Sequence, residues 1–290
     1  MMNGCRNREE KRERRRKTRQ EKREKTIQEV KSAPVLSAVY FFLRVAVIAV
    51  MCLQILNGDY YNVAMCALTL ILFTIPSIIE RRLKIDVPNV LEGIVLVFIF
   101  AAEILGEINS FYLKYTFWDT ALHTTTGFLS AAVGYSLVDI LNKNSKNINL
   151  SPFYVAFFAF CFSMTVAVMW EFIEFFMDYF FLTDMQKDTI LHTISTVELD
   201  PTKSNRAVVI RNITDVTVNG MPLGLGGYLD IGLYDTMKDM GVTFIGSLVF
   251  SIFWALYTLG KIKGWFILKL IPKRMEEEKK DDPEKLGDGK

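Results

Sequence analysis

Several apolar runs in this chain are each long enough to cross the roughly 30 Å of hydrocarbon in a membrane. They begin after a polar segment of 34 residues, and most charged residues lie outside them. We predict an all-α polytopic membrane protein, a bundle of about six transmembrane helices. The predicted spans are residues 35–56, 60–79, 88–108, 118–141, 152–181 and 235–260. Arg44 interrupts the first run, and the second run is weak.

The average composition does not reveal this organisation. The chain is 51% hydrophobic and 23% charged, with a net charge of +2, and a soluble domain can have the same averages. Cysteine is sparse and has no CxxC spacing, so we expect neither a disulfide framework nor a zinc ribbon. The polar segment is too long for the n-region of a signal peptide, so we expect the first run to remain as an anchor.

The two ends of the chain are highly charged. Residues 1–34 contain 13 Lys/Arg and 6 Glu and have no apolar stripe. We interpret this segment as a cytoplasmic tail that fixes the topology, or as an arm that binds anionic lipid headgroups. No aromatic residue interleaves its basic residues, so nucleic acid is not an expected partner. Residues 273–290 are expected to form a solvated cytoplasmic tail.

The short loops predict how the chain crosses the membrane. Cations follow the second, fourth and last apolar runs: Arg81, Arg82, Lys84, Lys143, Lys146, Lys261, Lys263, Lys269, Lys273 and Arg274. The loop at residues 57–59 contains none. The positive-inside rule therefore places both termini in the cytoplasm of a multi-pass cell-membrane protein. Five spans are expected within residues 35–181, and the last span with an interfacial anchor (Trp265 and Phe266) within residues 235–272.

Residues 182–234 are not apolar enough to span the membrane and are expected to lie outside the cell. Residues 207–210 and 216–218 are β-prone, and Asn219-Gly220 favours a turn. We predict a small extracellular β-hairpin cap, followed by a loop with three glycines. This loop is not predicted to bind phosphate, because no GK[ST] sequence follows it.

Acidic residues recur at helical spacing near the outer ends of four predicted spans. The sets are Glu103 and Glu107; Asp119 with His123; Glu171, Glu174 and Asp178; and Asp235 with Asp239. Spacings of three, four and seven residues place each set on one face of its helix. Acidic residues inside membrane helices usually face a bundle interior or water. Four such faces at one depth predict a single shared site.

This cluster needs a counter-charge. It contains eight carboxylates and one imidazole, and the cations near it in sequence are Lys114, Lys187 and Lys238. Crowded carboxylates must be protonated, paired or bound to a metal. A site rich in oxygen favours Mg²⁺, Ca²⁺ or Mn²⁺, and the second histidine, His192, would admit zinc or iron. Each set also has a structural interpretation, as a polar pair, as interfacial acids, or as acids that favour a helix start.

Three motifs follow one another along the chain: Trp118-Asp119-x-x-x-His123-x-x-x-Gly127, then Trp170-Glu171-x-x-Glu174, then Asp235-Thr-x-x-Asp239-Met240 with Gly246. On these motifs the chain resembles the YjdF-like family of uncharacterised bacterial inner-membrane proteins, and their order is similar to a broader VanZ-like pattern. The resemblance covers about residues 88–250. It implies a polytopic fold and marks Asp119, His123, Glu171, Glu174, Asp235 and Asp239 as matching positions, without supplying a reaction. It adds Gln186 and Asp188 as loop candidates.

Three functions remain open from the sequence. The first is a metal-dependent enzyme acting on a lipid or lipid-linked envelope substrate, with His123 or Glu174 as the general base. The second is a non-enzymatic membrane binding or assembly protein, in which the acidic cluster is structural. The third is a cation- or proton-coupled transporter. The inner halves of the predicted spans argue against transport, since Asp139 is nearly their only acidic residue.

Overall fold

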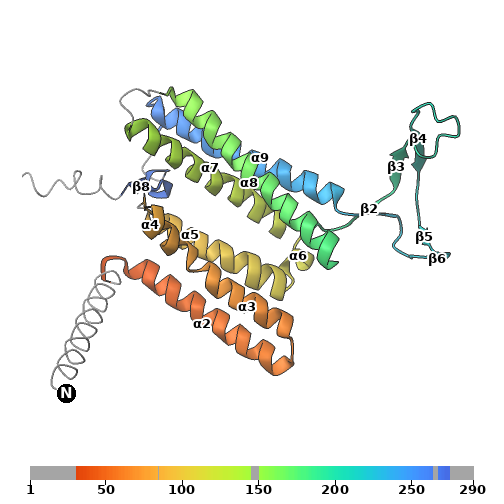
Figure 1. Cartoon of the computed structure of the whole chain (residues 1–290), viewed down its shortest axis with the longest axis horizontal. Coiled ribbons are helices and arrows are strands. Elements are labelled where there is room, and N and C mark those ends of the chain that lie inside the picture. The colour runs from red at the N-terminus through yellow and green to blue at the C-terminus, as the bar shows by residue number, and fades with distance from the viewer. Residues whose placement is uncertain (1–30, 84, 145–149, 264–266, 275–290) are drawn as a thin grey trace, which may run out of the picture. The chain divides into compact units, whose positions relative to one another are not determined.

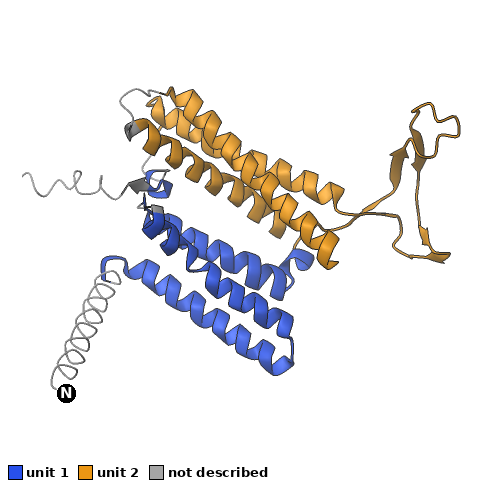
Figure 2. Cartoon of the chain, viewed as in Figure 1, with its two compact units in different colours: residues 1–114, 268–290 blue, residues 115–267 orange. Residues whose placement is uncertain are grey.

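The structure, a computed structural model, describes residues 31–83, 85–144, 150–263 and 267–274. The chain divides into two compact units, residues 1–114 with 268–290, and residues 115–267 (Figure 2). Most of the predicted basic segment lies outside the described residues. So do Trp265, Phe266 and the tail from residue 275 onward, so the interfacial anchor and the solvated tail stay predictions.

The first unit consists mainly of helices joined by short turns (Figure 1). These are α2 (Pro34–Asn57), α3 (Tyr60–Leu72), α4 (Ile75–Leu83), α5 (Asn89–Phe100), the π-helix η1 (Ala101–Ile108) and α6 (Phe111–Lys114). Proline begins α2, where its missing N–H is not needed, and Gly58 ends it in the left-handed region at φ 73°. The Asp59 side chain caps α3 by accepting a hydrogen bond from the Asn62 N–H at 3.1 Å.

The core of the first unit is apolar. Its buried residues are Leu43, Val47, Cys66, Phe73, Leu96 and Ile104. They come from α2, α3, α5 and η1, and Phe73 is the residue that ends α3. A short antiparallel ladder between β1 (Ile85–Asp86) and β8 (Lys273–Arg274) joins the two sequence segments of the unit.

The second unit contains a bundle of three long helices, which lie side by side in Figure 1: α7 (Trp118–Asn144), α8 (Pro152–Phe181) and α9 (Leu233–Thr258). Its closest approach is between α7 and α9. A Cβ atom added at Gly127 would lie 2.2 Å from the Thr243 carbonyl oxygen, and one at Gly246 would lie 2.0 Å from the Thr124 carbonyl oxygen. Glycine at these two positions therefore lets the two backbones touch, as small residues do in membrane helix pairs.

Among the described residues, four helical segments are long and apolar enough to cross a membrane: Pro34–Asn57, Tyr60–Arg82, Pro152–Phe181 and Leu233–Thr258. The chain is therefore a mostly helical protein with several candidate spans, as predicted, but six spans are not confirmed. The predicted span 88–108 corresponds to the consecutive helices α5 and η1, and the predicted span 118–141 corresponds to α7. Helix α7 has 27 residues, which corresponds to a length of about 40 Å.

The predicted β segment contains short two-stranded ribbons. β2 (Thr189–Leu191) pairs with β7 (Tyr228–Asp230), and β3 (Thr193–Thr196) pairs with β4 (Val208–Arg211). The turn predicted at Asn219-Gly220 joins β5 (Thr217–Val218) to β6 (Met221–Pro222). The β-prone runs are thus strands, each antiparallel to its partner. A hairpin cap over the acidic cluster is not confirmed.

Candidate functional site

The first part of the site lies between α7 and α9. Asp119 and His123 lie one turn apart on α7, and Asp239 of α9 faces them. The His123 Nε2 atom is 3.4 Å from Asp119 Oδ1 and 3.4 Å from Asp239 Oδ2. Asp239 is almost completely buried, with 1% of its side chain exposed. The imidazole therefore lies between two carboxylates that come from different helices.

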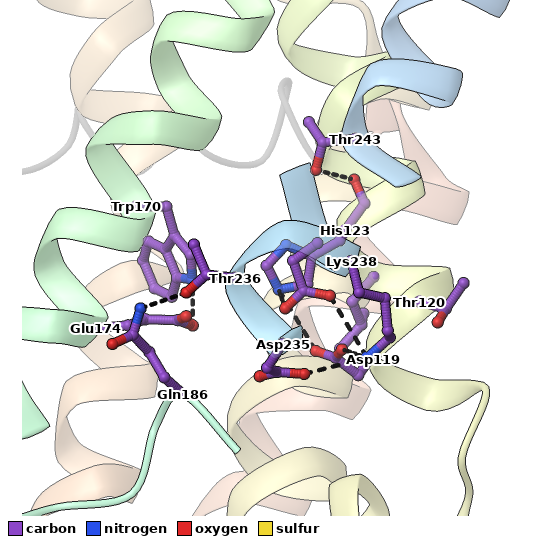
Figure 3. A network of polar contacts seen from close by, with 12 residues as sticks. Asp119, Thr120, His123, Trp170, Glu174, Gln186, Asp235, Thr236, Lys238 and Thr243 are labelled. Atoms are coloured by element: carbon purple, nitrogen blue, oxygen red, sulfur yellow. Dashed lines mark hydrogen bonds and ion pairs between the residues drawn. The ribbon is translucent and has the colours of Figure 1, made fainter. Parts of the chain in front are cut away.

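Lys238 provides the positive charge nearest to these acids. Its Nζ atom is 2.8 Å from Asp119 Oδ2 and 3.2 Å from Asp235 Oδ1, and Figure 3 shows it reaching both. It also lies 3.6 Å from Asp239 Oδ1. One ammonium group thus contacts three carboxylates, which leaves negative charge in excess around it.

The second part of the site comes from α8. Glu171 and Glu174 are both buried, with 6% and 7% exposure. Trp170 Nε1 donates a hydrogen bond of 2.7 Å to Glu174 Oε1 (Figure 3). Spacings of three and four residues bring Trp170, Glu171 and Glu174 to neighbouring positions on the helix.

Asp239 joins the two parts of the site. Single ligand atoms of Asp119, His123 and Asp239 lie within 4.8 Å of one another, and so do those of Glu171, Glu174 and Asp239. Both groups have the side-chain chemistry of divalent cation sites, and the second consists only of carboxylates. The sequence prediction of convergent acidic faces therefore agrees with the positions of these five side chains in the described structure.

Two oxygen atoms in this cluster lack a hydrogen-bond partner in the described part of the chain. They are Glu171 Oε2 and Asp239 Oδ1, and both are buried. The contact of Asp239 Oδ1 with Lys238 at 3.6 Å is too long for a hydrogen bond. A buried carboxylate oxygen without a donor is costly unless it is protonated or bound to a cation. These two atoms therefore mark the part of the cluster that needs a ligand.

The loop after α8 connects the cluster to the β segment. Gln186 Nε2 donates to Thr236 Oγ1 at 2.6 Å (Figure 3). The Lys187 N–H donates to Asp235 Oδ2 at 2.9 Å. Gly232 starts α9 with φ 84°, and a Cβ atom there would lie 2.7 Å from the Gln186 Cβ. Gln186, a loop candidate from the sequence, therefore lies against the first turn of α9.

Asp178 has a different environment from the other acids of α8. Its Oδ1 accepts hydrogen bonds from Thr183 Oγ1 at 2.7 Å and from the Met185 N–H at 2.6 Å. Its Oδ2 accepts one from the Gln186 N–H at 2.8 Å. The carboxylate thus holds the loop that follows the helix, and Asp178 belongs to neither group of convergent ligands.

Several other predicted residues lie outside these two groups. Glu103 and Glu107 belong to the first compact unit, and neither group includes them. The Nδ1 atom of His192 lies 3.0 Å from the Ile213 carbonyl oxygen. Partial burial, and then the nearby carboxylates, raise the pKa of Asp188. No described group of convergent ligands includes His192 or Asp188.

A column of hydroxyl groups continues from the cluster and was not recognised in the sequence. Thr243 and Ser247 are buried on α9, one and two turns after Asp239. The Thr243 hydroxyl donates to the His123 carbonyl oxygen at 3.2 Å, and Ser247 Oγ lies 2.6 Å from Ser163 Oγ of α8. The regular spacing of four residues was the available sequence signal.

Comparison with known proteins identifies a family of membrane proteins. The family described as "Predicted membrane protein (DUF2238)" has a model that matches residues 38–260. No curated protein and no solved structure matches the chain. The match includes residues 38–114 of the first unit and residues 115–260 of the second, which contain the whole of the cluster.

Proposed function

The chain belongs to the DUF2238 family of predicted membrane proteins, and we propose that it is a metal-dependent membrane enzyme. We assign it to the cell membrane, with six crossings and both termini in the cytoplasm. The acidic cluster then faces the outer leaflet, with residues 182–234 on the same side. The resemblance to YjdF-like proteins is compatible with this family. We also propose that the order of the motifs follows the broader VanZ-like pattern.

The proposed cation ligands are Glu171, Glu174 and Asp239. All three are buried carboxylates whose oxygens come within 4.8 Å of one another. The observation that carries the proposal is the pair of buried oxygens without a hydrogen-bond partner in the described residues, Glu171 Oε2 and Asp239 Oδ1. Hard oxygen ligands favour Mg²⁺, Mn²⁺ or Ca²⁺ over zinc. Lys238 makes its two shortest contacts with Asp119 and Asp235, so Glu171 and Glu174 of α8 have the greater need for an added cation.

The proposed reaction takes place on a lipid or lipid-linked envelope substrate at headgroup depth. When bound, a divalent cation supplies a Lewis acid that polarises a substrate oxygen or an attacking water. His123 is the proposed general base, because it is the imidazole of this cluster and its Nε2 atom lies 3.4 Å from two carboxylates that orient the ring. Asp119 is itself held by Lys238 at 2.8 Å, which fixes its position beside the imidazole.

The first experiment measures metal content. Purified full-length protein is incubated with Mn²⁺, desalted and analysed for manganese per chain. We expect retention by the wild type and loss in Glu171→Gln and Asp239→Asn. Asp215→Asn is the matched control, because Asp215 lies in the β segment and accepts hydrogen bonds from the Val216 and Gly224 N–H groups. Equal manganese in all four proteins would exclude this cation site.

The second experiment separates an enzyme from a structural cluster. His123→Ala removes the proposed base but leaves the three carboxylate ligands of α8 and α9. We expect this variant to retain manganese and to lose turnover of radiolabelled envelope lipids in proteoliposomes. A variant that loses thermal stability with no change in lipid turnover would instead support the non-enzymatic membrane binding or assembly protein.

The hydroxyl column favours proton-coupled transport as a second candidate. It extends the polar interior beyond the acids, along Thr243, Ser247 and Ser251, all of which are buried. The Ser251 hydroxyl has no hydrogen-bond partner in the described residues. A proton flux in liposomes that disappears in Glu171→Gln and falls in Ser247→Ala would favour this function over the enzyme.

A further inference from the structure

Arg44 lies in the interior of a candidate membrane span. Ten residues separate it from Pro34, the first residue of α2, so it lies about 15 Å along the helix. Its guanidinium carbon is 5.0 Å from the centre of the Tyr40 ring. No carboxylate forms an ion pair with it in the described part of the chain. An arginine at such a depth is costly, and it usually marks a partner or a pathway.

The Arg44 side chain lines a cavity of about 260 Å³ within the first unit. The other lining residues are Thr74, Ser77, Ile78 and Arg81. The lining thus combines two guanidinium groups with two hydroxyl groups, and it contains no acidic residue. Glu92, whose carboxylate accepts a hydrogen bond of 2.6 Å from the Tyr40 hydroxyl, does not line the cavity.

A helix start adds to the positive character of this cavity. Helix α3 ends at Leu72 and α4 begins at Ile75, so the second span is interrupted at Thr74. The Ile78 N–H donates to the Thr74 carbonyl oxygen at 3.1 Å, which makes Thr74 the residue before the first turn of α4. Pro76 has no N–H and the Thr74 N–H donates to the Ile71 carbonyl oxygen, so the Ile75 and Ser77 N–H groups are the donors that this first turn can offer to an anion. Thr74 and Ser77, at either end of this turn, both line the cavity.

We propose that this cavity binds a phosphate group, carried by the headgroup of an anionic phospholipid. Arginine matches phosphate geometry with paired hydrogen bonds, and two arginines with a helix start can neutralise one phosphodiester. Basic pockets between membrane helices bind such headgroups. The cavity, with a volume of about 260 Å³, has room for one phosphate group. This site is separate from the acidic cluster, and it does not depend on the proposed enzyme function.

The test titrates the detergent-purified full-length protein with phosphatidylglycerol, phosphatidylcholine or inorganic phosphate, and records the Tm. We expect phosphatidylglycerol to raise the Tm of the wild type with a defined midpoint, and phosphatidylcholine to have little effect. In Arg44→Gln/Arg81→Gln this midpoint should rise at least tenfold. Arg82→Gln/Lys261→Gln removes the same charge from exposed residues that do not line the cavity, and it should respond like the wild type. The basic residues 1–34 are present in every variant.

The outcomes separate the two sources of phosphate. If inorganic phosphate raises the Tm and competes with phosphatidylglycerol, the site accepts free phosphate as well; without this effect, the lipid is required. An unchanged midpoint in Arg44→Gln/Arg81→Gln overturns the proposal, as does an equal loss in the charge-matched control. If that double variant does not fold, Arg44→Lys/Arg81→Lys keeps the charge but loses the paired hydrogen bonds. Its midpoint should rise about fivefold, and an unchanged value counts against the site.

Discussion

The buried acids of the second unit fall into two groups that satisfy their carboxylates in opposite ways. Asp200 accepts hydrogen bonds from the N–H and hydroxyl groups of Thr202 and Ser204, and from the Arg206 N–H. Glu171 and Asp239 each keep a buried oxygen without a donor in the described residues. The first arrangement is complete within the chain, whereas the second needs a proton or a cation.

These two arrangements differ because different parts of the chain supply the hydrogen-bond donors. Asp200 lies in a turn and Asp178 in the last turn of α8, so backbone N–H groups a few residues later reach their oxygens. Glu171 and Asp239 stand inside helices, where the N–H groups are used by the helix itself. An acid in a helix core therefore has to find its donor on another element. Glu171 and Asp239 each keep one oxygen for which the described residues provide no donor, and these two acids are among the proposed cation ligands.

The largest expected effect comes from adding a divalent cation. With free Mn²⁺ at about 100 times the Kd, binding should stabilise the wild type by about 2.7 kcal/mol. Asp239→Asn should abolish this gain, because Asp239 contributes to both ligand groups. Asp178→Asn should keep it, because Asp178 is satisfied by the loop. Thermal unfolding with and without Mn²⁺ measures both, and a full gain in Asp239→Asn would remove the distinction between the two kinds of acid.

The next effect comes from removing a satisfied acid. Asp178→Ala takes away the acceptor for the Met185 and Gln186 N–H groups, and we expect a loss of about 2 kcal/mol in unfolding free energy. Amide hydrogen exchange at residues 185–187 should accelerate. Asp184→Ala is the control. Asp184 is exposed and its Oδ2 atom makes a long ion-pair contact of 3.7 Å with Lys187 Nζ, so its removal should cost less than about 0.5 kcal/mol. Similar losses in both variants would refute the structural role of Asp178.

Lys238 should give a smaller effect of the opposite sign. Its ammonium group contacts three carboxylates of the cluster and competes there with an added cation. Lys238→Met should therefore tighten Mn²⁺ binding about tenfold, or by about 1.4 kcal/mol. Lys187→Met is the matched variant, because the Lys187 ammonium group forms its ion pair with Asp184, which belongs to neither group of convergent ligands. Weaker Mn²⁺ binding in Lys238→Met would mean that the lysine positions the ligands.

The sequence predicted the long helices best where an apolar run carried its own start signal. Helix α8 covers the predicted residues 152–181, because Ser151 and Pro152 start it and the run stays apolar. The second predicted span is instead two helices, since Pro76 has no N–H to continue the first. The sequence did not predict which strands pair with each other. β4 pairs with β3, which lies earlier in the chain, and such pairings depend on the folded chain rather than on local composition.

For the candidate site, helical spacing predicted which acids share a face, but not which faces meet. The pairs Asp119/His123 and Glu171/Glu174 follow directly from that spacing. The central position of Asp239 depends on the close contact of α7 with α9 at Gly127 and Gly246. The spacing rule also applies poorly to Glu103 and Glu107, because residues 101–108 form a π-helix with a wider turn.

The smallest effect concerns the pH dependence of the Asp200 turn. Hydrogen bonds from Thr202, and then from Ser204 and Arg206, hold the pKa of Asp200 below its ordinary value. Because the folded pKa is depressed, the contribution of Asp200 to stability is fully present above its unfolded pKa of about 3.9, and it is lost as the pH falls through the folded value. The amide resonances of Thr202 and Ser204 should therefore stay at their neutral-pH positions until well below pH ~3.9, and Asp200→Asn should remove this titration. A midpoint at or above ~3.9 in the wild type would show that the turn does not stabilise the charged carboxylate, and the contrast with Glu171 and Asp239 would then rest on burial alone.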